Sequence, residues 1–179
     1  MKFYSVTVQA NGGTNATCLQ LAASDVRGTA RLYRNAQNRG DNRLYWNDMA
    51  TSTCEVRVNK VDSVLAQLQI PEVNLIKMDV QGFEAIALRG MQDTLDRSAK
   101  LIILSEFWPS GIQQTGENPV SMLRSLADKG FQIFHLARGG RLMPVSDYEQ
   151  VARSYTGRRY TSVVAAKGVD VRKLFGPRS

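Results

Sequence analysis

The sequence predicts an α/β fold in which helices flank a mostly parallel sheet. Short apolar segments of strand length alternate with amphipathic segments whose apolar residues recur at helical spacing. The segment 100–108 (KLIILSEFW) is almost continuously apolar at its centre, which is typical of a strand covered on both faces. A length of 179 residues and a hydrophobic content of 43% fit one globular domain.

The order of the predicted elements alternates strands with helices, which favours parallel pairing in a layered sheet. The predicted strands are 17–24, 30–35, 55–61, 74–80, 100–108, 131–138 and 161–167. The predicted helices are 61–70, 83–97 and 120–130, the last ending at Gly130 in a left-handed cap. A polar loop rich in Gly and Pro is expected over 109–119, and ARGGR (137–141) is expected to form a hairpin turn.

The charge of the chain is concentrated near its end. The formal net charge is +7, and residues 151–179 hold seven basic side chains against one acid, so we assign a basic tail over 168–179 of a single domain spanning 1–179. A basic terminus attracts phosphate groups on nucleic acids, nucleotide sugars or membrane surfaces, or it serves only as a solvated end.

Membrane insertion and secretion are not expected. No apolar run approaches the roughly 20 residues of a membrane-spanning helix, and the first residues lack the apolar centre of a signal peptide. Cys18 and Cys54 form neither a disulfide framework nor a metal-binding spacing. These features predict a cytoplasmic protein.

Acidic residues follow three predicted strands at the point where each strand ends. Asp79 follows LIKM, Glu106 follows LIILS, and Ser24-Asp25 closes the first strand. In open α/β sheets ligands bind beyond the carboxyl ends of the strands, so these side chains are expected to share one polar pocket. Asp79 and the following Glu84 also have structural explanations, as a helix cap and as an acid in the first turn of a helix.

Four ordered segments of the sequence resemble the FkbM-type family of S-adenosylmethionine-dependent methyltransferases. They are LAASDVRGTARLY (21–33), VDSVL (61–65), LIKMDVQGFEAIALRGM (75–91) and LIILSEFW (101–108). The resemblance extends from about residue 15 to 167. It implies a Rossmann-like class I methyltransferase fold.

The chain departs from the family pattern in two respects. Gln81 stands where the family usually has Glu. No Gly-rich turn follows a first strand, although such a turn normally receives the cofactor, so the fold is expected to be incomplete and to lack the N-terminal cofactor-binding strands. A truncated chain of this kind would leave sheet edges bare, which predicts a partner chain or a second copy that completes the sheet.

The resemblance implies O-methylation of a hydroxyl group on a sugar or natural product, with S-adenosylmethionine as cofactor and a small-molecule or glycan acceptor. Asp79 is the predicted catalytic residue, as a general base or as a group that orients the hydroxyl. The cofactor-binding residues implied are Ser24, Asp25 and Asp79. The substrate-binding residues implied are Glu84, Glu106 and Trp108; no metal site is predicted.

Two other functions compete with methyl transfer. The first is a degenerate or split methyltransferase-like binding module without independent activity, which the missing Gly-rich turn favours. The second is nucleic-acid binding through SYTGRRY (154–160), where tyrosines flank two arginines. Such a short cluster is a weak signal, so nucleic acid is not an expected partner.

Overall fold

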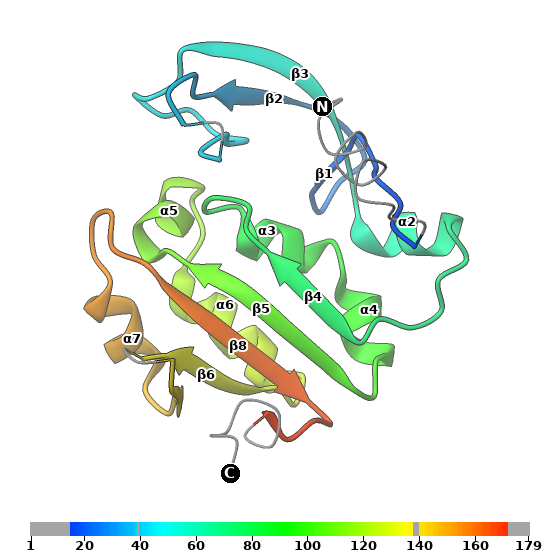
Figure 1. Cartoon of the computed structure of the whole chain (residues 1–179), viewed down its shortest axis with the longest axis vertical. Coiled ribbons are helices and arrows are strands. Elements are labelled where there is room, and N and C mark those ends of the chain that lie inside the picture. The colour runs from blue at the N-terminus through cyan, green and yellow to red at the C-terminus, as the bar shows by residue number, and fades with distance from the viewer. Residues whose placement is uncertain (1–14, 39, 138–139, 172–179) are drawn as a thin grey trace.

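The computed structural model describes residues 15–38, 40–137 and 140–171, and within them the chain forms two sheets with helices (Figure 1). The smaller sheet has three strands in the order β1-β3-β2, and the larger has five in the order β4-β5-β8-β6-β7. The opening NGG and most of the expected basic tail lie outside the described residues.

The elements follow one another along the chain largely as the hydrophobic pattern predicts. The strands are β1 (Ala22–Ala23), β2 (Gly28–Arg34), β3 (Ser52–Asn59), β4 (Leu75–Met78), β5 (Leu101–Phe107), β6 (Gln132–Leu136), β7 (Leu142–Pro144) and β8 (Thr161–Lys167). The helices are α2 (Val61–Gln67), α3 (Glu84–Arg89), α4 (Gln92–Arg97), α5 (Pro109–Gln114), α6 (Pro119–Asp128) and α7 (Tyr148–Ser154). An α/β fold is therefore confirmed.

The prediction of a mostly parallel sheet is not confirmed. In the five-stranded sheet β4 pairs with β5 in parallel, but β8 lies antiparallel between β5 and β6, and β7 pairs antiparallel with β6. The cause is the connection after β6, where a hairpin and α7 deliver the chain to the carboxyl end of β5. Thr161 therefore pairs with Phe107, and β8 runs back along β5.

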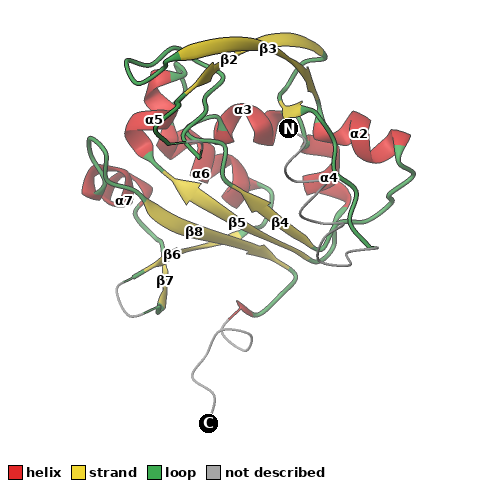
Figure 2. Cartoon of the chain, turned by 45° about the horizontal axis from the view of Figure 1, so that its top comes forward, coloured by secondary structure: helices red, strands yellow, loops and turns green. Residues whose placement is uncertain are grey.

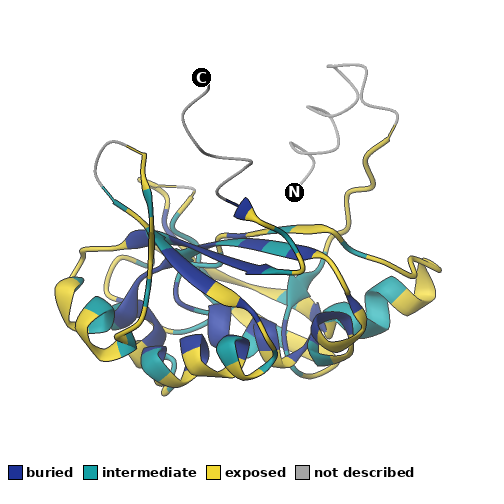
Figure 3. Ribbon diagram, turned by 90° about the horizontal axis from the view of Figure 1, so that it is seen from below, coloured by how far each residue is buried: buried dark blue, intermediate teal, exposed yellow. Residues whose placement is uncertain are grey.

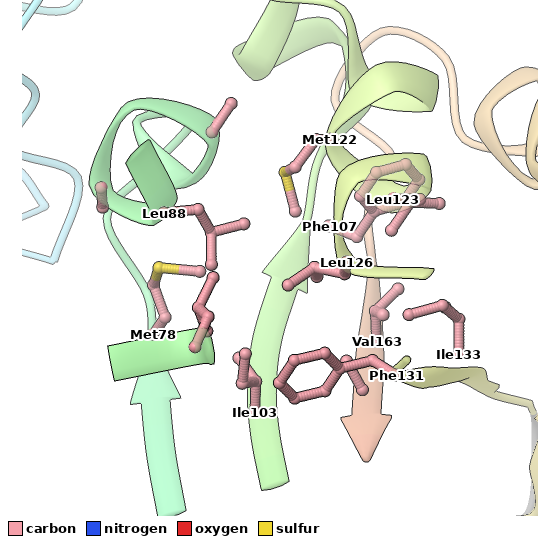
Figure 4. Packing of buried hydrophobic residues seen from close by; sticks show 14 of the residues in the cluster. Met78, Leu88, Ile103, Phe107, Met122, Leu123, Leu126, Phe131, Ile133 and Val163 are labelled. Atoms are coloured by element: carbon pink, nitrogen blue, oxygen red, sulfur yellow. The ribbon is translucent and has the colours of Figure 1, made fainter. Parts of the chain in front are cut away.

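The helices lie along one side of the five-stranded sheet (Figure 3). Residues of β5 alternate, so that Leu101, Ile103 and Phe107 are buried in the main core with helical side chains. Figure 4 shows this core, in which Leu88 of α3 and Leu123 of α6 close over the sheet. Burial of each large apolar side chain contributes about 1.5–3 kcal/mol.

The opposite face of the sheet is covered differently from the expectation of helices on both faces. Ile102 and Leu104 remain partly buried there and pack on a small cluster that contains Phe134, Val164 and Val171. The two faces of β5 thus pack against one large and one small cluster of buried apolar side chains.

Three predicted elements differ from the structure. The expected strand 17–24 is reduced to the two residues of β1. The expected helix 83–97 is divided into α3 and α4 at Gly90, where a Cβ would overlap the backbone carbonyl of Ser24. The expected loop 109–119 contains α5, which begins at Pro109 and buries Ile112 completely. A proline suits the first turn of a helix because its missing N–H would be unpaired there.

The predicted end of α6 is confirmed. Helix α6 is capped at its start by the Asn118 side chain, which accepts from the N–H groups of Val120 and Ser121, and Gly130 beyond its end has φ +84°. Strands β6 and β7 pair antiparallel, with His135 opposite Met143, and residues 138–139 of the expected ARGGR turn lie outside the described residues.

Substitution of Gly90 tests how the small sheet is held to the core. A Cβ at this position would overlap the Ser24 carbonyl, so we expect Gly90→Ala to lower the free energy of unfolding by about 1–3 kcal/mol. Gly28→Ala is the matched control, because a Cβ there meets nothing within 4 Å. Urea unfolding of the two variants measures the difference, and equal stability would contradict this packing.

Candidate functional site

A tight turn connects the end of β4 to the start of α3 and forms the base of the candidate site. Gln81 and Gly82 are both left-handed, with φ of +53° and +93°. A Cβ on Gly82 would lie 2.7 Å from the backbone of Gly111 and 2.8 Å from the hydroxyl oxygen of Tyr45. Only glycine fits this position, because it needs both the conformation and the space.

Gln81 brings together two of the predicted acids. Its side-chain Nε2 donates to Oδ1 of Asp79 at 2.8 Å and to Oε2 of Glu106 at 3.0 Å. The Tyr45 hydroxyl donates to the backbone carbonyl of Gln81 at 2.8 Å. The predicted convergence of Asp79 and Glu106 at one sheet edge is therefore present, with an amide between them.

Glu84 lies beneath this turn with no exposed surface. The Val80 N–H donates to its Oε1 at 3.3 Å, while Oε2 has no hydrogen-bond partner among the described residues. Burial raises the pKa of Glu84 to about 6, the backbone N–H groups around the turn oppose this rise, and the Glu106 carboxylate adds to it. Its expected contact with a substrate stays a prediction, since the side chain is enclosed by protein.

A cavity of about 330 Å³ opens beside the turn. Figures 1 and 2 show that β2 and β3 arch over the carboxyl ends of β4 and β5, and the connection between β2 and β3 supplies one wall. The lining residues are Asn35, Gln37, Asn38, Asp41, Arg43, Met49, Gln81, Glu106, Trp108, Arg158 and Tyr160. Two predicted site residues, Glu106 and Trp108, thus line the same cavity.

The environment of Glu106 favours its protonated form more than water does. Burial raises the pKa of Glu106, and the nearby Asp79 carboxylate raises it further. Lys77 and the amide of Gln81 act in the opposite direction. A carboxylate with a raised pKa is a stronger base when it ionises.

Trp108 combines a structural role with a place in the cavity wall. The indole is 8% exposed, and its Nε1 donates to the carbonyl of Gly157 at 2.6 Å. The guanidinium of Arg43 lies 4.6 Å from the ring centroid and also pairs with Asp41 at 2.6 Å. This stacking connects the β2–β3 segment to the larger sheet.

Ser24 and Asp25 do not line this cavity. Asp25 pairs with Arg89 at 3.1 Å, at the far end of α3 from Glu84, and Arg89 also pairs with Glu117 at 2.6 Å. The Ser24 side chain is buried beside them. The structure therefore separates the first strand end from the other two, in contrast to the expected common pocket.

Sequence analysis did not identify the residues that close the cavity from above. Asp41, Arg43 and Tyr45 come from a segment with no strand or helix pattern. Arg43 and Tyr45 contact residues distant in sequence, namely Gln114 and the backbone of Gln81. The SYTGRRY segment was noted for nucleic acid, but Arg158 and Tyr160 line this cavity. The mixture of aromatic and charged side chains in RLYWND (43–48) was the signal that could have indicated these cavity residues.

The raised pKa of Glu84 makes the free energy of unfolding depend on pH. The unfolded chain loses this proton near the ordinary value of 4.5 and the folded chain near 6, so stability falls as pH rises through that window. We expect Glu84→Gln to lack this fall, which is on the order of 2 kcal/mol. Urea unfolding across the window checks this, with the exposed Glu55→Gln as control. The same fall in both variants would contradict the assignment.

The described residues contain no helix long and apolar enough to cross a membrane, and no group of three or more side chains placed to bind a metal ion. No curated protein and no solved structure matches the chain. The model of the Methyltransferase FkbM domain matches residues 3–133, which is more than half of the chain. The acids at the ends of β4 and β5, and the turn that leads from β4 into α3, fall within this match. The chain belongs to the FkbM methyltransferase family.

Proposed function

We propose that the chain is an S-adenosylmethionine-dependent O-methyltransferase that acts on a hydroxyl of a small-molecule or glycan acceptor, such as a sugar or natural product. Family membership supports methyl transfer. The observation that carries the acceptor site is the half-buried Glu106 carboxylate, which lines a cavity and shares the Gln81 amide with Asp79. The parallel pair β4–β5, with acids at both carboxyl ends, supports a Rossmann-like arrangement.

The acceptor hydroxyl would be deprotonated by the pair formed by Asp79 and Glu106. Gln81 engages Oε2 of Glu106 and leaves Oε1 for a hydroxyl in the cavity. The raised pKa of Glu106 supports its role as the proton acceptor. Asp79 is proposed as the second catalytic carboxylate. It either accepts the proton instead of Glu106 or orients the acceptor hydroxyl.

The walls of the cavity fit a ring with hydroxyl groups. Tyr160, which is 61% exposed, and Trp108 offer aromatic surface, while Gln37 and Asn38 offer amide groups. Pockets of this composition use a few polar groups to orient a ligand on apolar surface. Glu84 is proposed to affect acceptor binding indirectly, because it supports the turn that carries Gln81.

The side chains at the first strand end fit the adenine of S-adenosylmethionine. Asp25 has a side chain that is 30% exposed, and its oxygens keep free lone pairs beside the bonds from Ser24 and Arg89. A free carboxylate lone pair suits the adenine amino group, and Ser24 supports Asp25 from beneath. When bound, the cofactor supplies a sulfonium-activated methyl group, so the protein has chiefly to align the reacting atoms.

A binding module without activity is the second candidate function. β4 lies at the edge of the five-stranded sheet, and Leu75 on it is 65% exposed. Edge strands pair readily with other chains, so a partner or a second copy could complete the sheet at β4. We also propose a cytoplasmic location, because the free and exposed Cys18 and Cys54 suit a reducing compartment.

Calorimetric titration with S-adenosylmethionine separates the two functions. We expect the purified chain to bind, and Asp25→Ala to weaken binding at least tenfold, because the adenine loses its acceptor. Asp128→Ala is the control, since this exposed residue ends α6 at the opposite end of the sheet. Absence of binding by the unmodified chain would favour the module instead.

Turnover of the acid variants tests the acceptor chemistry. We expect Glu106→Gln and Asp79→Asn each to reduce methyl transfer to a panel of methyl glycosides by roughly 100-fold or more. Cofactor affinity should be largely intact, since the asparagine side chain keeps an oxygen acceptor at Asp79. Formation of S-adenosylhomocysteine measures the rate, and Glu55→Gln serves as control. Full activity of Asp79→Asn would limit that residue to shaping the turn.

A further inference from the structure

The amide group of Gln81 is positioned between two carboxylates. Its Nε2 lies 2.8 Å from Oδ1 of Asp79 and 3.0 Å from Oε2 of Glu106. A primary amide carries two N–H donors, so this pair of bonds uses its full donor capacity. Hydrogen bonds from a donor to ionised acids are stronger than those between neutral groups.

The two hydrogen bonds from the Gln81 amide to Asp79 and Glu106 are called here the clamp. The surrounding structure fixes the backbone of Gln81 in the position that the clamp requires. The residue has φ +53°, a conformation that costs free energy for any residue with a Cβ. Tyr45 holds its carbonyl, and the neighbouring Gly82 is packed against Gly111. Arg43 in turn lies 3.5 Å from the Tyr45 hydroxyl. The turn is therefore held by two other segments, the β2–β3 connection and α5, as well as by its own residues.

The charges around the clamp show that the Gln81 amide counteracts repulsion between neighbouring carboxylates. Asp79 and Asp41 raise the pKa of Glu106, and Glu106 raises that of the buried Glu84. Lys77 is the nearby cation; its Nζ lies 3.8 Å from Asp79 in an exposed contact, where an ion pair contributes little. The amide of Gln81 is thus the well-placed donor shared by Asp79 and Glu106.

We propose that Gln81 is a positioning residue whose amide occupies the place of a bridging divalent cation or shared proton, holding the carboxyl groups of Asp79 and Glu106 together in a fixed orientation. The proposal rests on the proposed function in one respect, since it takes these acids as the reactive pair. It adds that the pair is organised by a neutral side chain and needs no divalent cation for its geometry.

A single substitution separates an amide clamp from a cation site. Gln81→Glu replaces the donor with a third carboxylate close to the other two, which creates repulsion. Oxygen ligands from several carboxylates are those that Ca²⁺ prefers. The variant should therefore acquire Ca²⁺ affinity that the unmodified chain lacks.

Calorimetric titration with CaCl₂ tests this inference without cofactor or acceptor. We expect Gln81→Glu to bind Ca²⁺ at least tenfold more tightly than the unmodified chain. Gln69→Glu is the matched control, because Gln69 is the other described non-glycine residue with positive φ, at +55°, and is exposed beyond α2. Equal Ca²⁺ affinity of the unmodified chain and Gln81→Glu, including no binding by either, would overturn the proposal.

A second measurement covers a failure of Gln81→Glu to fold. In Gln81→Ala the clamp is lost without added charge, so the pKa of Glu106 should rise further in a carboxyl-carbon NMR titration, whereas Gln69→Ala should leave it unchanged. An unchanged pKa in Gln81→Ala would overturn the proposal. Neither experiment involves methyl transfer. If Gln81→Glu gains Ca²⁺ binding while the unmodified chain binds no S-adenosylmethionine, the role assigned to Gln81 stands and the proposed function fails.

Discussion

The left-handed turn between β4 and α3 is the constraint on which the site depends. Two consecutive residues, Gln81 and Gly82, have positive φ, and for Gln81 this conformation carries a cost. The cost is offset by contacts from three directions: the Tyr45 hydroxyl, the backbone at Gly111, and Glu84 beneath. Because the turn is held, the Gln81 amide reaches both strand-end acids.

Burial of Glu84 contributes to this support at a cost to stability. One of its oxygens accepts from the Val80 N–H, and the other has no partner among the residues that the structure describes. A carboxylate without exposed surface is expensive to ionise, which the upward shift of its pKa reflects. Strain and unpaired polar groups of this kind gather at functional sites, where the surrounding fold maintains them.

The roof of the cavity depends on packing between segments far apart in the chain. Arg43 stacks on Trp108 and pairs with Asp41, while Trp108 holds the carbonyl of Gly157. Three segments thereby meet over the ends of β4 and β5. Arg158 lines the same cavity as Glu106, so the fold that encloses the cavity also determines its polarity.

The sequence by itself indicated every described strand except β7, the helical regions of α2, α3, α4 and α6, and the acids at the ends of β4 and β5. These features follow from local periodicity and from the fixed direction of parallel neighbours. It also placed the chain in its family. Only the tertiary structure decided that β8 runs antiparallel, that Asp25 pairs with Arg89 away from the other acids, and that Arg43 and Tyr45 cover the site. Those features arise from contacts between residues distant along the chain. Side-chain shape and hydrogen bonding determine such contacts, and they cannot be read from the local sequence pattern.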